Sequence, residues 1–319
     1  MTDSSNPTVS VVIATHGRAR LLAETLDALD AQEGPSFEVV VVDDDSPDDT
    51  SEMAAARGVK ALRVRRGGPG RARQAGWQAA AGSVIAFTDD DCVPTPQWLA
   101  ELIAPIVRGD ADFVQGRTLP RPDQLHLRGP WSRTQRIVSE KGFYETCNIA
   151  YRRDALERLG GFSPEYEGPF TSGEDCDLAW RAKKAGYRSA FAPDALVHHA
   201  VWPSSYRERI RNIRRREMVV RVVRDHPEIR ALLYRRYFFR SSHLRTLVAI
   251  GGLVGAGSVR RWLPAAIAGV TTIGYVVRTR DRPQPAARRV LQLGQIVTVQ
   301  LLELAVFIRS SIRHRTLLL

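Results

Sequence analysis

Short apolar runs alternate with amphipathic stretches through the first part of the chain. Strands are predicted at four of these runs: 9–14, 37–42, 61–64 and 83–87. The runs VSVVIA and FEVVVV are continuous and rich in β-branched residues, which predicts strands buried on both faces. Apolar residues then recur at helical spacing from Leu21 to Leu29, and further helices are predicted at 48–57 and 71–81. This alternation predicts an α/β fold with a mainly parallel sheet flanked by helices.

Strand signals become sparser after residue 110. The remaining strands are predicted at 112–117, 147–152 and 189–192. Two helices are predicted at 155–159 and 178–185, and a glycine of the kind that ends helices follows each of them. The Pro- and Arg-rich segment 119–141 is expected to be a long loop that acts as a lid or lies beside a bound substrate.

The last part of the chain is rich in arginine and in apolar runs. An Arg-rich helix is predicted at 207–224, and apolar runs follow at 246–259, 262–277 and 290–308. The first two are shorter than the roughly 20 residues that cross a bilayer, and the third contains Glu303. The pattern favours a helical region that lies on a membrane or re-enters it. A soluble helical subdomain with inward apolar faces is the alternative.

Charge is divided unevenly between two parts of the chain. The 319 residues carry a net charge of +11, with 44% hydrophobic and 25% charged residues, which excludes a disordered or coiled-coil chain. Residues 1–202 carry a net −6, whereas residues 203–319 carry +17. We therefore expect two parts, a folded domain at 1–202 and a basic region at 203–319 that has an anionic partner.

Cysteine usage and the N-terminal sequence bear on the compartment. The three cysteines are widely spaced and include no CxxC pair, so they predict neither a disulfide framework nor a zinc site. A reducing compartment is the simpler interpretation. The opening MTDSSNPT has no basic segment before the first apolar run, and we expect no signal peptide.

Polar clusters follow three of the predicted strands, at Thr15–Arg18, Asp43–Ser46 and Asp89–Asp91. Ligands of open parallel sheets bind outside the carboxyl ends of the strands, so we expect these clusters to share one pocket. Asp89 and Asp91 can reach one hard divalent cation, which in turn binds a diphosphate. A solvated acidic turn is the alternative, but the second acidic strand end favours the functional interpretation.

Three further motifs add chemistry. The segment GGPGRAR at 67–73 offers backbone N–H groups and cations to a pyrophosphate, although it is neither a Walker A loop nor a GxGxxG fingerprint. Glu174 and Asp175 precede a predicted helix, where they suit either a general base or an acidic pair stabilised by the helix dipole. His198 and His199 suit either a structural role or a metal-ligand role. Spacing alone does not decide between these alternatives.

Several ordered motifs between about Val9 and His199 match a known pattern. Residues 39–50 (VVVVDDDSPDDT) resemble VVDDGSxDxT, with Asp45 in place of glycine. Residues 68–92 resemble GxxxARNxG…AxGxxIxFLDxD, and residues 147–199 resemble the acceptor half with its ED motif. As a set they resemble the family 2 glycosyltransferases, which are inverting nucleotide-sugar enzymes of the GT-A fold. The resemblance covers some 60% of the chain and implies a GT-A catalytic domain at 1–202, with a nucleotide-sugar-binding half at 1–115 and an acceptor half at 116–202.

The resemblance also implies roles for individual residues. It implies a donor site, with the nucleoside at Thr15 and Asp44 and the diphosphate near Arg73, and we add Arg18 and Asp89 to the donor-binding residues. It implies Mg²⁺ or Mn²⁺ as the cofactor, with the ligands Asp91, Asp89 and His199. It implies Asp175 as the catalytic base and Glu174 as a catalytic-site carboxylate on the acceptor side. The change from glycine to Asp45 adds negative charge near the donor and leaves the donor's identity open.

We therefore expect metal-dependent, inverting transfer of one sugar to an acceptor in the synthesis of a cell-surface glycan, glycolipid or polysaccharide. The QxxRW motif of processive members does not follow the ED motif, which favours single-sugar transfer. A non-catalytic protein that binds a nucleotide sugar or an anionic polymer is the alternative. The expected partners are a nucleotide-sugar donor, a lipid-linked sugar acceptor and an anionic membrane surface, with no nucleic acid. The expected location is cytoplasmic, at the inner face of the cell membrane.

Overall fold

The computed structural model describes residues 9–168, 172–248 and 286–319, with side chains from Gln292 onward in the last range. The chain divides into two compact units, unit 1 (Met1–Ser204) and unit 2 (Ser205–Leu319). The apolar run at 262–277 and most of the run at 246–259 lie outside the described residues.

Unit 1 is built on an eight-stranded sheet with the order β3-β2-β1-β4-β7-β6-β8-β5. Its strands are β1 (Val9–Thr15), β2 (Phe37–Asp43), β3 (Lys60–Arg63), β4 (Val84–Asp89), β5 (Cys92–Pro94), β6 (Phe113–Pro120), β7 (Asn148–Arg152) and β8 (Ser189–His199). Four neighbouring pairs are parallel, and the three pairs that involve β7 or β5 are antiparallel. The predicted α/β class is confirmed, with a sheet that is mixed because β7 runs against both β4 and β6.

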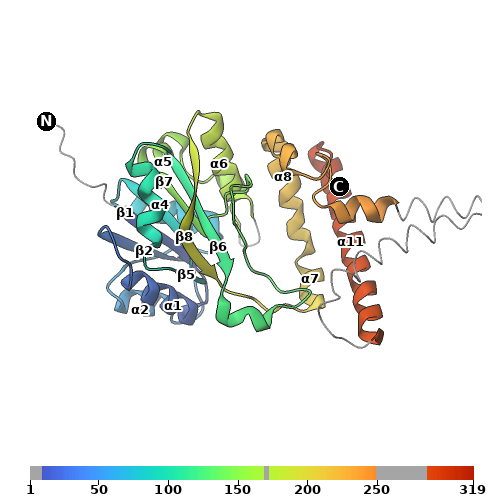
Figure 1. Ribbon diagram of the computed structural model, residues 1–319, viewed down its shortest axis with the longest axis horizontal. Helices are drawn as coiled ribbons and strands as arrows, with labels where there is room; N and C mark the ends of the chain where they lie inside the picture. The colour runs from blue at the N-terminus through green and yellow to red at the C-terminus, as the bar shows by residue number, and fades with distance from the viewer. Residues whose placement is uncertain (1–8, 169–171, 249–285) are drawn as a thin grey trace, which may run out of the picture. The chain divides into compact units, whose positions relative to one another are not determined.

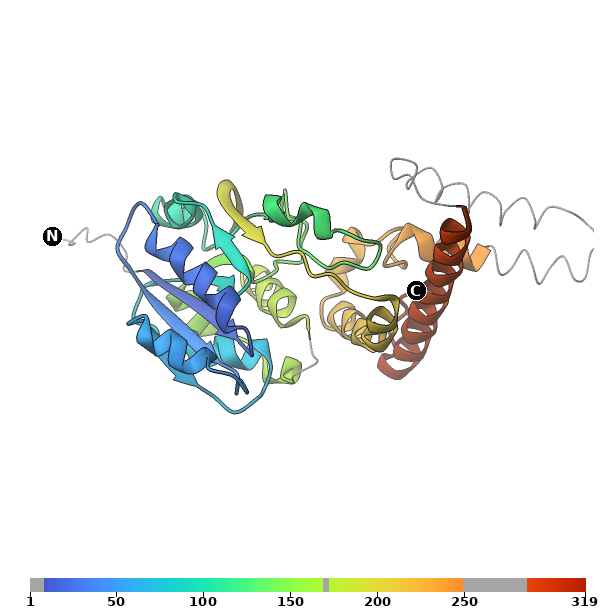
Figure 2. The same ribbon diagram turned by 90° about the horizontal axis from the view of Figure 1, so that it is seen from below.

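Helices pack on both faces of this sheet (Figures 1 and 2). They are α1 (Ala19–Asp30), α2 (Thr50–Ala56), α3 (Pro69–Ala79), α4 (Trp98–Val107), α5 (Arg153–Leu159) and α6 (Glu174–Lys184), with 3-10 helices η1 (Pro122–Leu127) and η2 (Pro164–Tyr166). Val11 and Ile13 of β1 belong to a core with α1 and α4, whereas Val12 belongs to a core with α3 and α6. Both faces of β1 are therefore buried, which explains its unbroken apolar sequence.

Some elements of unit 1 differ from the sequence prediction. Helix α4 and strand β5 were not predicted, since Pro105 interrupts the helical pattern of α4 and the three residues of β5 show no period. Strand β8 extends beyond the predicted 189–192 to His199. Helix α6 begins at Glu174 and not at 178, directly after Gly173, whose φ of 99° is a conformation that favours glycine.

Unit 2 is helical. It contains α7 (Tyr206–Arg211), η3 (Ile213–Arg216), α8 (Glu217–Asp225), η4 (Pro227–Leu232), a helix that covers 241–248 and the long helix α11 (Ala286–His314). The prediction of one continuous helix at 207–224 was wrong, because α7 ends at Arg211 and a 3-10 turn follows. This turn buries Ile213 and directs Arg216 toward Glu303.

Helix α11 contains a stretch, Gln292–His314, that is long and apolar enough to cross a membrane by length and composition. Within unit 2 it packs against α7, η3 and α8. Its Glu303 is buried, pairs with Arg209 and with Arg216 Nε (3.3 Å), and lies 3.2 Å from His243 Nε2. Burial disfavours the charged carboxylate, but the hydrogen bond from His243 and the two guanidinium charges outweigh it and lower the pKa of Glu303 to about 2.

Candidate active site

The carboxyl ends of three adjacent strands bring the predicted polar clusters together. Thr15, Asp43 and Asp89 are the last residues of β1, β2 and β4. In the parallel register Thr15 lies beside Asp43, and Ala14 lies beside Asp89. The residues that follow each strand therefore start from one edge of the sheet, where open α/β sheets bind ligands.

Asp90 connects the loops that follow β1 and β4. Its carboxylate accepts hydrogen bonds from Thr15 Oγ1 (2.8 Å) and Arg18 Nη1 (2.7 Å). Burial raises the pKa of Asp90 to about 6, although the charge of Arg18 acts in the opposite direction. Thr15 is buried in this contact, whereas the Arg18 side chain is 41% exposed and can also contact a ligand.

Arg73 on α3 pairs with two carboxylates at once. Its Nη2 lies 2.7 Å from Asp89 Oδ1, and its Nη1 lies 2.9 Å from Glu174 Oε1. Burial opposes the charge of Arg73, but the two carboxylates outweigh it and raise the pKa of the guanidinium. Burial also raises the pKa of Glu174, whereas at Asp89 the attraction of Arg73 outweighs burial and lowers the pKa. A glycine at position 70 permits this packing, since a Cβ there would lie 3.1 Å from Glu174 Cγ.

Asp175 lies in the first turn of α6 beside Glu174 and is partly exposed. Its Oδ1 accepts a hydrogen bond from the Cys176 N–H (2.8 Å). Burial, followed by the negative charges of Glu174 and Glu145, raises the pKa of Asp175 well above its ordinary value. Once ionised, such a carboxylate is a stronger proton acceptor than an ordinary one, which suits general-base chemistry.

The loop after β2 is fixed by Asp44. Its two carboxylate oxygens accept hydrogen bonds from the N–H groups of Gly67 (2.7 Å) and Gly68 (2.9 Å). The glycine-rich segment is thus held against the strand end where the nucleoside is expected. Asp45 has a φ of 62°, a conformation that favours glycine and that Asp tolerates. The Asp45 side chain is exposed and pairs with Arg63 (3.2 Å), so its added charge is partly compensated.

Three side chains could together hold a metal ion, since ligand atoms of Asp91, Cys92 and His199 lie within 4.8 Å of one another. His199 Nδ1 lies 2.9 Å from Ala200 O, an acceptor, so Nδ1 donates this hydrogen bond; Nε2 lies 3.6 Å from Asp91 Oδ1. Burial raises the pKa of the Cys92 thiol well above its usual value and keeps it protonated. The carboxylate and the imidazole thus fit a divalent cation, whereas the thiol does not.

Sequence reasoning assigned no role to two residues at this site. Asp90 stands between the predicted ligands Asp89 and Asp91, and its position in the acidic run was the available signal. Trp202 donates a hydrogen bond from Nε1 to Asp91 Oδ2 (2.6 Å). No period in the sequence marks Trp202, because the contact arises where the end of β8 pairs with β5 in antiparallel register.

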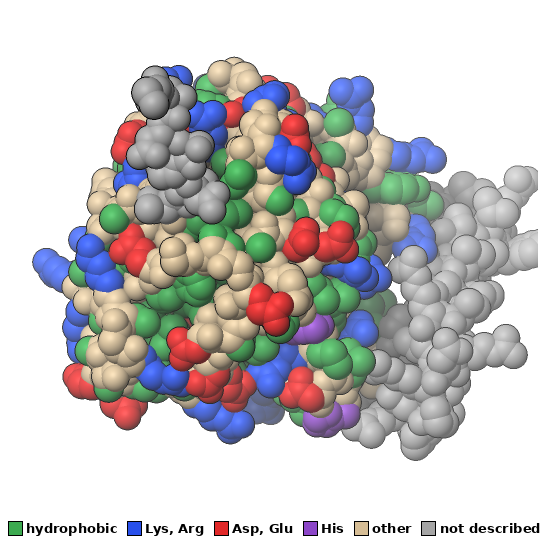
Figure 3. Space-filling view, turned by 60° about the vertical axis from the view of Figure 1, so that its left-hand side comes forward, with side chains coloured by type: hydrophobic (Ala, Val, Ile, Leu, Met, Phe, Trp, Pro, Cys, Tyr) green, Lys and Arg blue, Asp and Glu red, His purple; other side chains and the backbone are tan. Residues whose placement is uncertain are grey.

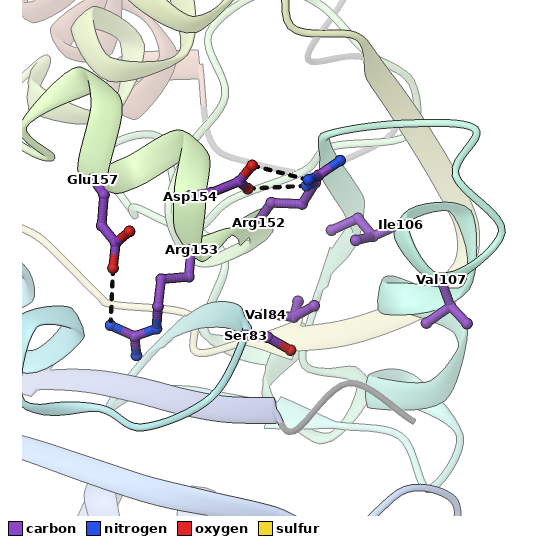
Figure 4. Close-up of a pocket in the computed structure, with 8 residues that line it drawn as sticks. All are labelled: Ser83, Val84, Ile106, Val107, Arg152, Arg153, Asp154 and Glu157. Atoms are coloured by element: carbon purple, nitrogen blue, oxygen red, sulfur yellow. Dashed lines mark hydrogen bonds and ion pairs between the residues drawn. The ribbon is translucent and has the colours of Figure 1, made fainter. Parts of the chain in front are cut away.

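A cavity of about 510 Å³ lies at the other end of β4 (Figure 4). Ser83, immediately before β4, lines it, whereas Asp89 ends this strand. Its charged side chains pair with one another, as in Arg152 with Asp154 (2.9 Å). On the face in Figure 3, acidic and basic side chains are interspersed with apolar ones, so charge sign alone does not mark a site there. We therefore place the candidate active site at the carboxylate cluster and not at this cavity.

Comparisons with known proteins identify the family of this chain. The model of the family described as glycosyl transferase family 2 matches residues 10–160. Glycosyltransferase AglE of Haloferax volcanii is 30% identical over 214 residues, which are 63% of this chain and 69% of that protein. Succinoglycan biosynthesis protein ExoO of Rhizobium meliloti is 32% identical over 211 residues, which are 60% of this chain and 61% of that protein.

Solved structures show the same fold. The mannosyltransferase PcManGT from Pyrobaculum calidifontis, in complex with GDP-Man and Mn²⁺, superposes with a TM-score of 0.66 at 20% identity, over 96% of this chain and 87% of that one. At this identity the likeness establishes the fold, which is the GT-A arrangement. Together with the family model and AglE, it leads to one conclusion. The chain belongs to glycosyltransferase family 2.

Proposed function

We propose that this enzyme transfers one sugar, with inversion, from a nucleotide-sugar donor to an acceptor hydroxyl, and that the reaction depends on a divalent cation. One observation carries the proposal: the carboxylates of Asp89, Glu174 and Asp175 gather around the buried Arg73 at the carboxyl edge of the sheet. The donor would bind to the half 1–115, where Thr15, Arg18 and Asp44 lie. The acceptor would bind to the half 116–202.

The residues that would hold the cation are Asp91 and His199, with Asp89 on the diphosphate side. Mg²⁺ or Mn²⁺ would there neutralise negative charge on the leaving diphosphate. Arg73 fixes Asp89 by an ion pair, and its Nε has no hydrogen-bond partner in the described part of the chain. An oxygen of the bound nucleotide sugar would be a hydrogen-bond acceptor for this buried N–H group. The complex of PcManGT with GDP-Man and Mn²⁺ supports a donor and a cation of this kind.

Asp175 would act as the base. It takes the proton of the acceptor hydroxyl while the hydroxyl oxygen forms its bond to the anomeric carbon. The bond from this carbon to the diphosphate breaks on the opposite face, and the nucleoside diphosphate leaves with the electron pair. Attack opposite the leaving group inverts the anomeric configuration. Glu174, held by Arg73, would orient the acceptor side of the site.

We also propose that unit 2 binds an anionic membrane surface, where a lipid-linked acceptor would be presented. A three-residue turn, Arg235–Tyr237, is closed by a hydrogen bond from the Phe238 N–H to Tyr234 O (3.0 Å). Arg235 and Arg236 have φ values of 51° and 68°, where Asn or Gly is favoured, so the turn keeps two cations at a conformational cost. Both are exposed, and Tyr234 and Tyr237 beside them are 42% and 47% exposed. Arginine next to tyrosine is typical of membrane-interface contacts.

A donor screen tests the proposed reaction. The full chain is incubated with different nucleotide sugars and a lipid extract, in Mn²⁺ or in EDTA, and release of nucleoside diphosphate is measured. We expect release with one donor, only in the presence of the cation. NMR of the product reports the anomeric configuration, and mass spectrometry reports how many sugars were added. Retention, or a ladder of products, would contradict the inverting single transfer.

A further inference from the structure

Trp202 makes a short polar contact with a carboxylate of the candidate cation site. Its indole Nε1–H donates to Asp91 Oδ2 at 2.6 Å, and Asp91 is buried. The Arg18 guanidinium lies over the same ring, 4.8 Å from its centroid, and its Nη1 lies 3.6 Å from Asp91 Oδ2. This oxygen of Asp91 thus accepts a hydrogen bond from the segment after β8 and lies within ion-pair distance of a cation from the loop after β1.

The backbone fixes the indole in this place. The Trp202 N–H donates to Arg133 O (2.8 Å), and the Arg133 N–H donates to Trp202 O (2.9 Å). The Ala200 N–H donates to Asp91 O (2.9 Å), which ties the segment to the strand end that carries the carboxylate. Asp91 and Trp202 are therefore held on paired segments, and the side-chain contact does not depend on a free loop.

This contact leaves the two oxygens of Asp91 in different surroundings. Oδ2 accepts from the indole, whereas Oδ1 faces His199 Nε2 at 3.6 Å, a separation that suits two atoms binding the same ion. Partners of metal ligands commonly orient the ligand in this way. We propose that Trp202 is a positioning residue that presents Asp91 Oδ1 to the divalent cation. This inference rests on the proposed cation role of Asp91 and His199.

Binding of Mn²⁺ alone, without donor or acceptor, tests the inference. The free Mn²⁺ is measured by electron paramagnetic resonance during titration of the full chain and of Trp202→Phe, which keeps an aromatic ring but removes the donor. We expect an increase in Kd of about 10-fold, at the lower end of the usual effect of such partners. Trp77→Phe is the control, because it removes an indole hydrogen bond to Gln74 (2.8 Å) on α3 and should leave the Kd unchanged.

A second pair of variants covers the case in which Trp202→Phe does not fold. Trp202→Gln keeps an N–H donor and Trp202→Leu does not, although the two side chains are of similar size. We expect Trp202→Gln to bind Mn²⁺ more tightly than Trp202→Leu. The positioning role would be overturned if the unaltered chain and Trp202→Phe bound Mn²⁺ equally, and Trp202→Gln and Trp202→Leu did so as well. Tighter binding by Trp202→Phe would also overturn it, because the indole would then obstruct the ion. If the unaltered chain bound no Mn²⁺, the proposed cation dependence itself would fail.

Discussion

Charged side chains cluster in both units of this molecule, but in opposite proportions. In unit 1 carboxylates outnumber the cations that Arg18 and Arg73 supply; they are Asp89, Asp90, Asp91, Glu174 and Asp175. In unit 2 a single carboxylate, Glu303, meets Arg209, Arg216 and His243. The first cluster has an excess of negative charge, and the second has an excess of positive charge.

The pKa values follow these proportions. Burial raises the pKa of Asp90 to about 6 and also raises those of Glu174 and Asp175. At Glu303 the surrounding cations overcome burial and lower the pKa to about 2. The comparison teaches that the carboxylate-rich cluster can gain from a further cation or a proton, which suits the proposed active site. The Glu303 cluster is already compensated and contributes to the packing of unit 2.

The largest expected effect belongs to the proposed base, Asp175. Asp175→Asn should lower kcat by about 100- to 10,000-fold with little change in donor affinity, because proton transfer belongs to the transition state. Steady-state kinetics and donor titration measure the two quantities. Asp177→Asn, in the same helical turn and paired with Arg181 (2.9 Å), is the matched control and should keep kcat within a few-fold. Weaker donor binding with unchanged kcat would assign Asp175 to the donor side.

Removing the proposed cation ligand Asp91 should have the next largest effect. Asp91→Asn replaces a carboxylate by a neutral amide, a poor ligand for Mg²⁺ or Mn²⁺, and activity should fall by at least about 100-fold. Circular dichroism checks that the variant is folded, and kinetics at rising Mn²⁺ should show partial recovery. Undiminished activity of the unaltered enzyme in EDTA would rule out the cation-dependent reaction.

We expect the Glu303 cluster to affect the stability of unit 2 and not the rate of catalysis. Glu303→Gln leaves two guanidinium groups without their carboxylate and should lower the free energy of unfolding of unit 2 by about 3 kcal/mol. Urea denaturation followed by circular dichroism measures the change. Glu217→Gln is the control, since its side chain is partly exposed and its pairs with Arg313 and His314 should be worth about 1 kcal/mol or less. If both variants lost the same free energy of unfolding, the Glu303 cluster would contribute no more to stability than the Glu217 pair.

The lowered pKa of Glu303 also predicts a pH dependence. Its usual value is 4.5 and its value in the fold is about 2, so the stabilisation is fully present above about pH 4.5 and is lost as the pH falls toward 2. Urea midpoints measured across this range should decline more steeply for the unaltered chain than for Glu303→Gln. Parallel curves would show that other carboxylates govern the acid transition.

The smallest expected effect concerns the membrane surface. Arg235→Asn with Arg236→Gly removes two cations, each worth about 1 kcal/mol near an anionic leaflet, and should weaken binding to phosphatidylserine vesicles about 30-fold. The same change relieves the positive-φ strain, so thermal stability should rise. Removing two exposed arginines elsewhere in unit 2, with Arg211→Gln and Arg214→Gln, is the charge-matched control. An equal loss of vesicle affinity in this control would indicate that the attraction comes from the overall charge of unit 2 and not from the turn. If the unaltered chain did not bind vesicles at all, the proposed membrane contact would be wrong.

Much of unit 1 could be predicted because burial on both faces leaves a clear mark in sequence. The continuous apolar runs predicted strands β1 and β2. The polar residues at the ends of β1, β2 and β4 predicted the edge of the sheet at which they meet. The motifs of the resemblance led to the family, which the comparisons confirm. The individual roles of the site residues remain predictions.

The rest depends on contacts between segments far apart in the chain. The pairing of Arg73 with Glu174 joins two helices, and no local pattern encodes it. The contact of Trp202 with Asp91 requires the antiparallel pairing of β5 with β8, which was not predicted because β5 has only three residues. In unit 2, the break after Arg211 follows from the burial of Ile213, which an arginine-rich sequence conceals.

The backbone pairing of Arg133 with Trp202 links the 119–141 segment to the proposed cation site. If Trp202 adds free energy to cation binding, thermodynamic reciprocity requires the cation to add the same free energy to the state in which Trp202 is in place. Amide hydrogen exchange at Arg133 and Trp202 should then slow as the cation site fills. Hydrogen exchange in this segment would then report how much of the cation site is filled.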